Sequence, residues 1–95
     1  MIFTITSLRH ENDSLKHSRC FGYYTDYDKA VTAVVENRCD LHEAYYTYLV
    51  IEQVPEGIHP IAKLETWFKY DLIEMKWLNC LKPEIFRKFK GFSIG

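Results

Sequence analysis

Hydrophobic and polar positions predict five β-strands along this chain. Residues 2–8 alternate, with Ile2 and two threonines on one face and Phe3 and Ile5 on the other, which is the period-two pattern of a half-buried strand. Residues 62–70 alternate in the same way, and residues 20–24 and 75–80 are shorter apolar or aromatic runs. Residues 45–54 are almost continuously apolar or aromatic. That run is typical of a central strand covered on both faces.

The hydrophobic period changes to that of a helix after residue 25. Four apolar residues follow the i, i+3, i+4, i+7 spacing of a helix face, namely Tyr27, Ala30, Val31 and Val34. Thr25 precedes them as an N-cap, so we predict a helix over residues 26–38. Pro83 suits the first position of a short terminal helix.

The order of these elements predicts the fold class. It is β-β-α-β-β-β-α, and we expect an α+β fold. Its four- to five-stranded, mostly antiparallel sheet carries the main helix on one face, and a short C-terminal helix follows. Residues 9–19 are polar, without a regular period, and predict a long loop. Ninety-five residues are enough for one core but not for two, so residues 1–95 form a single predicted domain.

Composition and charge narrow the classes of partner. The net charge is −1, which gives no general attraction to nucleic acid or acidic membranes, and no apolar run approaches the ~20 residues of a membrane span. Residues 26–56 carry seven acidic against two basic side chains, whereas residues 82–95 carry four basic against one acidic. Aromatic residues make up 16% of the chain, more than a small core needs. We therefore expect surface aromatics at an interface, and self-association into a homo-oligomer.

The cysteines and the first residues predict a cytoplasmic protein. Three cysteines at irregular spacing do not form a secreted disulfide framework. The alternating start of the chain is typical of a strand, not of a signal peptide.

Several short motifs resemble a group of small proteins of unassigned function from bacterial and phage genomes. The motifs are Phe21-Gly22-Tyr23-Tyr24-Thr25 before the helix, Tyr48-Leu49-Val50-Ile51-Glu52, Glu56-Gly57 and Trp67-Phe68. The resemblance covers about residues 20–70 and implies a compact α+β fold of mobile-element origin. It implies no activity and no catalytic residues.

Two pairs of side chains have the spacing of zinc half-sites. They are His17-x-x-Cys20 and Cys39-x-x-His42, and a two-residue gap lets cysteine and histidine converge on one zinc ion. The predicted topology brings both pairs to the same end of the domain. The alternative is that these residues carry no metal, since free cysteine is among the most buried residue types. We expect no other cofactor.

No motif points to an enzyme. His42-Glu43 begins a zincin pattern, but Tyr46 stands where the second histidine belongs. The chain has no phosphate-binding glycine loop and no nucleophile elbow. A cysteine paired with a histidine is the remaining catalytic possibility, and we expect a protein that is not an enzyme.

Two sets of residues are candidate binding surfaces. The first set surrounds the predicted loop and comprises Arg9, His10, Lys16, His17 and Arg19, which suit a small anionic ligand. The second set is acidic and aromatic and comprises Glu36, Asp40, Glu43, Tyr46 and Tyr48, which suit a protein contact. Each set also has a plain alternative, a solvated loop and a solvated acidic face.

We therefore expect a small non-enzymatic binding module that acts through protein–protein contacts. An inhibitor or adaptor of a host defence component is one role compatible with the phage resemblance. The alternative is an oligomeric sponge that sequesters a phosphorylated nucleotide through the Arg/His loop. Neither hypothesis involves a membrane or requires nucleic acid.

Overall fold

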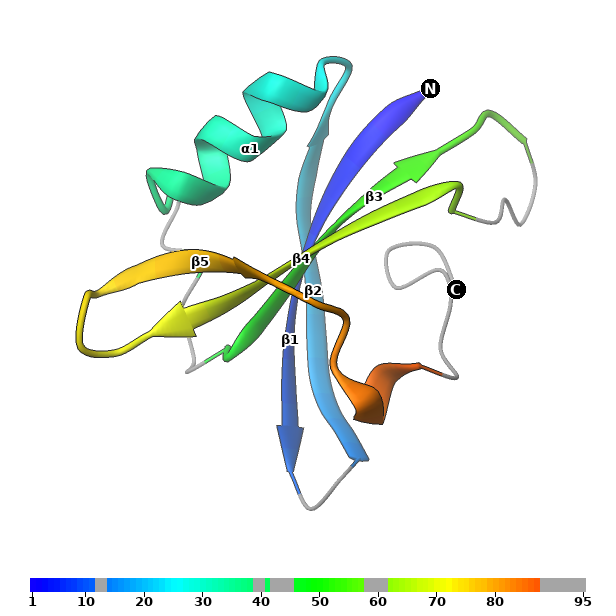
Figure 1. Cartoon of the computed structure of the whole chain (residues 1–95). Helices are drawn as coiled ribbons and strands as arrows, with labels where there is room; N and C mark the ends of the chain where they lie inside the picture. The colour runs from blue at the N-terminus through cyan, green and yellow to red at the C-terminus, as the bar shows by residue number, and fades with distance from the viewer. Residues whose placement is uncertain (12–13, 39–40, 42–45, 58–61, 88–95) are drawn as a thin grey trace.

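The chain folds as a five-stranded antiparallel sheet with one α-helix packed on it, as a computed structural model shows (Figure 1). The structure describes residues 1–11, 14–38, 41, 46–57 and 62–87. The elements are β1 Ile2–Glu11, β2 Ser14–Tyr24, α1 Tyr27–Val35, β3 Tyr48–Val54, β4 Leu64–Asp71, β5 Lys76–Cys80 and a 3₁₀ turn at Glu84–Phe86. The predicted α+β class and the predicted order of elements are confirmed.

The strand order places β3 in the middle of the sheet. It runs β2-β1-β3-β4-β5, and each neighbouring pair is antiparallel. β1 pairs with β3 from Ile2 opposite Val54 to Leu8 opposite Tyr48. The helix therefore lies in the connection between edge strand β2 and central strand β3, and strands distant in sequence become neighbours.

The polar stretch at residues 9–19 is not the loop that its composition predicts. β1 continues to Glu11 and β2 begins at Ser14, so most of the stretch lies in two paired strands. Arg9 pairs with His17, and Ser7 pairs with Arg19. Backbone hydrogen bonds to the neighbouring strand hold this extension, and they do not depend on an apolar alternation. The loop prediction was wrong for this reason.

The helix is shorter at both ends than predicted. Its N-cap is Asp26 and not Thr25, because the Asp26 carboxylate accepts a hydrogen bond of 2.8 Å from the backbone N–H of Asp28. The last helical residue is Val35, and Asn37 follows with a positive φ of 51°. Asparagine tolerates this left-handed conformation, which commonly ends a helix.

Asn37 also links the end of α1 to the edge strand β5. Its Oδ1 accepts a hydrogen bond of 3.0 Å from the indole N–H of Trp77 on β5. Trp77 is buried against the helix side of the sheet. A single polar residue thus ends the helix and fixes its position over β5.

Both faces of the sheet carry a core. The helix-side core comprises Ile5, Ala30, Ala33, Val34, Leu41, Tyr46, Leu49, Ile51, Phe68, Tyr70 and Trp77. The second core, on the opposite face, comprises Leu8, Val50, Trp67 and Phe86. Figure 1 shows α1 and the terminal 3₁₀ turn on opposite sides of the sheet. The prediction that the central strand is covered on both faces is confirmed.

In the described residues, the predicted terminal helix is a single 3₁₀ turn. Phe86 is the buried residue of this turn, and its ring packs against the sheet. Phe86 stacks on Trp67 with a centroid distance of 5.5 Å and meets Tyr48 edge to face at 5.7 Å. Residues after Arg87 lie outside the described residues. Phe86 therefore closes the second core from a segment that has little regular structure of its own.

We expect Phe86→Ala to lower the free energy of unfolding by about 3 kcal/mol, because it removes a buried ring and leaves a cavity against Trp67. Urea denaturation followed by tryptophan fluorescence measures this loss. The matched control is Leu81→Ala, since Leu81 is almost fully exposed and its truncation should change stability by less than about 0.5 kcal/mol. Equal effects of the two substitutions would contradict the assignment of Phe86 to a core.

Candidate functional site

The basic residues of the first hairpin share one face of the sheet. Arg9 pairs with His17 and Arg19 pairs with Ser7, and cross-strand partners point to the same side. The side chains of His10 and Lys16 lie outside what the structure describes. Three of the five predicted ligand-binding residues are thus brought together on the helix side.

The chain itself engages these three side chains. The His17 ring stacks on Tyr46, and its Nδ1 is 2.5 Å from the Tyr46 hydroxyl. The Arg19 guanidinium lies 4.8 Å above the centre of the Phe21 ring, and both Arg9 and Arg19 make further interactions within the chain. These three basic side chains of the hairpin are exposed, and His17 and Arg19 each also contact an aromatic ring of the chain itself.

The described zinc half-site does not converge on one point. His17 pairs with Arg9 and Cys20 pairs with Thr6, and residues three apart in a strand point to opposite faces of a sheet. The two-residue gap suits a loop or a helix, but residues 17–20 are in β2. Cys39 and His42 lie outside the described residues. Among the residues described, no group of three or more His, Cys, Asp or Glu is arranged to hold a metal ion.

The predicted acidic and aromatic contact set is not one surface. Tyr46 is only 2% exposed and belongs to the helix-side core, so the expectation that its ring meets a partner was wrong. Tyr48 is half-buried against Phe86. Glu36 is exposed and pairs with Arg38 at 3.0 Å. Asp40 and Glu43 lie outside the described residues.

An apolar groove lies on the β4–β5 hairpin. Its volume is about 570 Å³, and it is lined by Lys69, Tyr70, Asp71, Leu72, Ile73, Leu78, Asn79 and Cys80. Lys69 and Leu78 are cross-strand partners, so they share the face opposite α1. We call this hollow, with the turn beside it, the hairpin groove.

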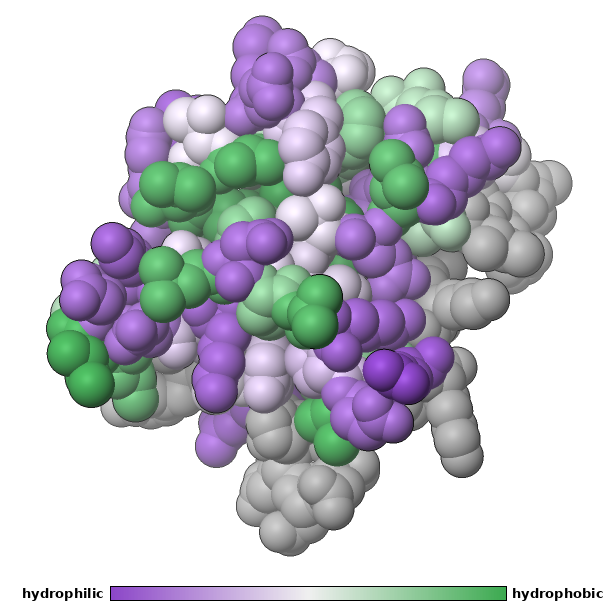
Figure 2. All heavy atoms as spheres, in the orientation of Figure 1, coloured by the Kyte–Doolittle hydropathy of each residue, from purple (hydrophilic) through white to green (hydrophobic). Residues whose placement is uncertain are grey.

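The turn between β4 and β5 exposes large apolar side chains. Leu72 is 70% exposed, Ile73 91% and Met75 69%. Figure 2 shows hydrophobic surface at the left of the molecule, where the β4–β5 hairpin of Figure 1 ends. Turns are normally built from small polar residues, so two adjacent large apolar residues at positions 72–73 were the sequence feature that indicated this site, and the sequence reasoning missed it.

Backbone geometry fixes the form of this turn. The Asp71 carboxylate accepts hydrogen bonds from the backbone N–H groups of Ile73 at 2.9 Å and Glu74 at 3.2 Å. Met75 then adopts a left-handed φ of 57°. An Asp-capped turn of this kind is defined by local hydrogen bonds, so the apolar side chains are held outward on an ordered backbone.

The two edges of the sheet differ in how they are protected. β2, at one edge, shifts register twice against β1 and contains Gly22 in an extended, glycine-specific conformation with φ of 153°. β5, at the other edge, pairs with β4 from Cys80 to Lys76 without a shift. Bulges and charges discourage pairing with further strands, and Lys76 is the one charged residue of β5. The β5 edge is therefore the more accessible one for another strand.

No protein-family model, no curated protein and no solved structure matches this chain. Among the described residues, no helix is long and apolar enough to cross a membrane. The resemblance to small bacterial and phage proteins stays a prediction.

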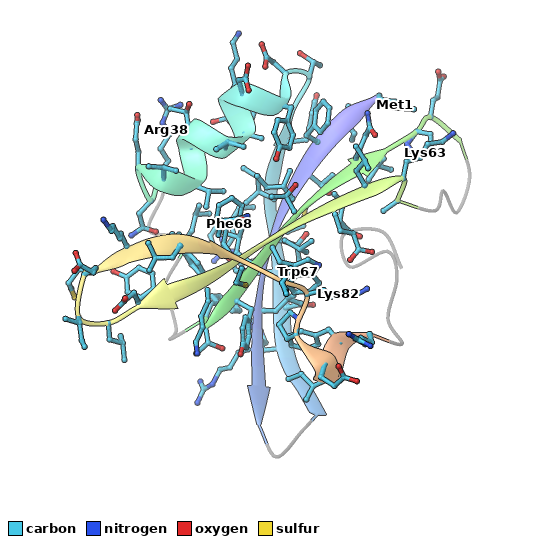
Figure 3. The ribbon with its side chains drawn as sticks, in the orientation of Figure 1. Met1, Arg38, Lys63, Trp67, Phe68 and Lys82 are labelled. Atoms are coloured by element: carbon cyan, nitrogen blue, oxygen red, sulfur yellow. The ribbon has the colours of Figure 1, made fainter. Side chains whose placement is uncertain are left out.

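The ion pair between Glu65 and Lys82 lies next to Trp67, at the edge of the second core. The Glu65 carboxylate accepts a hydrogen bond from the indole N–H of Trp67 at 3.0 Å and pairs with the Lys82 ammonium at 3.0 Å. Figure 3 shows Trp67 and Lys82 side by side next to the chain that leads out of β5. The cluster anchors the terminal segment, and its polar groups satisfy one another.

The cysteines differ in environment. Burial raises the pKa of the Cys80 thiol, and the charge of Lys69 offsets part of that rise. A cysteine nucleophile needs the opposite shift, because the thiolate is the reactive form. Cys20 is exposed on β2, and Cys39 lies outside the described residues.

We expect iodoacetamide to alkylate Cys20 roughly tenfold faster than Cys80 at pH 8, because Cys80 is partly buried and its thiol stays protonated. The experiment uses the Cys39→Ser variant, so that two thiols remain, and mass spectrometry of the digested protein measures each rate. Unfolding in urea should make the two rates equal. Faster alkylation of Cys80 in the folded protein would contradict the geometry described for it.

Proposed function

We propose that this protein is a small non-enzymatic binding module whose partner is an extended apolar segment of another protein. The segment pairs with the outer edge of β5 and places alternate side chains in the hairpin groove. The observation that carries this proposal is the set of exposed apolar side chains around the groove, namely Leu72, Ile73, Met75 and Leu78.

Addition of a strand fits this surface better than a flat contact does. A sheet edge offers backbone donors and acceptors, which give affinity, and a neighbouring pocket that selects side chains gives specificity. β5 is a regular edge strand, and the hairpin groove lies directly beside it. The charges around the groove balance, with Lys69 and Lys76 against Asp71 and Glu74. The expected partner segment is therefore apolar and close to neutral.

The energy available at the groove predicts modest affinity. Burial of one Leu or Ile side chain contributes about 1.5–3 kcal/mol, so the apolar side chains of the turn and β5 supply on the order of 10 kcal/mol if fully covered. Association costs about 4–15 kcal/mol in lost freedom. The difference leaves at most about 6 kcal/mol, so we expect dissociation constants of roughly tens of micromolar or weaker.

The biological setting in this proposal is the cytoplasm, and the role is inhibitor or adaptor. The resemblance to small phage and bacterial proteins supports a host defence component as the partner. The raised pKa of Cys80 supports a role without cysteine chemistry. The sponge hypothesis at the Arg/His hairpin is less favoured, because His17 and Arg19 are already engaged by Tyr46 and Phe21.

A displayed library of ten-residue peptides tests the proposal. We expect selection against this protein to enrich peptides with alternating apolar residues, and we expect Leu78→Asp to weaken their binding by about tenfold or more, because it places a charge in the groove. Methylation of alternate backbone amides in a selected peptide should abolish binding, since strand pairing needs those donors. Fluorescence anisotropy measures each affinity.

The control is Leu64→Asp, because Leu64 is also an exposed leucine (61% against 39% for Leu78) and lies at the other end of β4. It should leave peptide affinity unchanged. If selected peptides bind Leu78→Asp as well as the parent protein, the groove is not the site. If the protein forms dimers that Leu78→Asp dissociates, a second copy is the occupant and the proposed partner is wrong.

A further inference from the structure

A second hollow lies between β2 and the C-terminal end of α1, on the other side of the sheet from the hairpin groove. Gly22 pairs with Ile5, which belongs to the helix-side core. A side chain at position 22 would therefore point to the helix side of the sheet. A side chain at Gly22 would meet nothing within 4 Å. The φ of 153° at this position suits glycine alone. The backbone conformation of β2 therefore leaves open space beneath the helix.

This inner hollow has a mainly apolar wall. Its volume is about 170 Å³, and it is bounded by Ile5, Phe21, Gly22, Tyr23, Tyr24, Ala33, Arg38 and Leu41. Phe21 and Ala33 give it apolar lining of the kind that accepts a ring. Tyr23, Tyr24 and Arg38 are the lining residues with polar side-chain groups.

An outer hollow adjoins it and has a different character. Its volume is about 310 Å³, and it is bounded by Tyr24, Asp28, Lys29, Thr32 and Arg38. Tyr24 and Arg38 line both hollows, so these two side chains stand at the junction. Together the hollows fall within the range of about 300–1,000 Å³ that is usual for small-molecule sites.

Two cations face the outer hollow. Arg38 projects from the end of α1 (Figure 3), and its Nε and Nη2 donate to the Glu36 carboxylate at 3.2 and 3.0 Å. Both side chains of this pair are about half exposed, and exposed pairs of this kind contribute little to stability. Lys29 is exposed and has no ion pair with any residue that the structure describes. Asp28 balances Lys29 and Glu36 balances Arg38, so a phosphate in the outer hollow has to replace Glu36 as the partner of the exposed guanidinium.

We propose that the paired hollows bind a nucleoside monophosphate, with the base in the inner hollow over Gly22 and the phosphate in the outer hollow against Arg38 and Lys29. The apolar wall suits a flat ring, and an arginine fork suits a phosphate because two parallel N–H groups match two oxygens. This site goes beyond the proposed protein contact and uses none of its residues.

Calorimetric titration of the full chain with AMP, GMP, CMP and UMP tests the proposal. We expect at least one of the four to bind with a dissociation constant below about 100 μM, and the matching nucleoside and inorganic phosphate each to bind at least about tenfold more weakly. In a nitrogen-15 spectrum the bound nucleotide should shift the amide signals of Gly22 and Ala33. Failure of all four to bind at millimolar concentration would overturn the proposal.

Substitutions locate the site. Arg38→Gln should weaken binding by about tenfold or more and Lys29→Gln by less, with unchanged near-ultraviolet circular dichroism because both side chains are exposed. The matched control is Arg87→Gln, another exposed arginine in an ion pair, with Glu84, which should leave affinity unchanged. Binding that survives Arg38→Gln, or that inorganic phosphate reproduces, overturns the assignment. Leu78→Asp should not affect this binding, so the outcome is independent of the peptide experiment.

Discussion

The burial of β3 on both faces is the constraint on which the rest of the structure depends. Leu49 and Ile51 point into the helix-side core, and Val50 points into the second core. A strand that buries both faces needs a cover on each side, because neither row of side chains can be left in water. α1 supplies one cover. The other is Phe86, delivered by a 3₁₀ turn too short to be stable by itself.

The sequence predicted those elements whose own residues decide them. The apolar run that ends at Val54 and the helical spacing after Asp26 each follow from which side chains need burial, and they appear as β3 Tyr48–Val54 and α1 Tyr27–Val35. The length of the first hairpin was not predicted correctly, because Arg9 and His17 are held by pairing with each other. Such pairing is a property of two strands together and not of either one. Strand order also depends on such pairing, and no periodicity within one segment contains it.

The zinc half-site and the contact at Tyr46 were predicted wrongly for a related reason. Placing His17 in a loop over residues 9–19, directly before a strand that begins at Cys20, made the two look convergent, whereas their places within one strand put them on opposite faces. Tyr46 was assigned to the surface because aromatics were abundant, yet its hydroxyl meets His17 and its ring completes the helix-side core. The arrangement of site residues could be predicted only where the secondary structure that carries them was predicted correctly. The apolar residues at positions 72–73 were readable from sequence alone, since a turn has no core reason to contain them.

The β4–β5 hairpin is the stronger candidate for contact with another protein, because its turn lies outside both cores. α1 and Phe86 cover the centre of the sheet, and the turn lies beyond both (Figure 1). Leu72 and Ile73 therefore contribute little to either core, and a polar turn held by the Asp71 carboxylate would serve the fold equally well. Large apolar side chains that are exposed and unnecessary for folding increase the risk of aggregation. Their presence on an Asp-capped turn beside a regular sheet edge supports the proposal that a partner segment covers them.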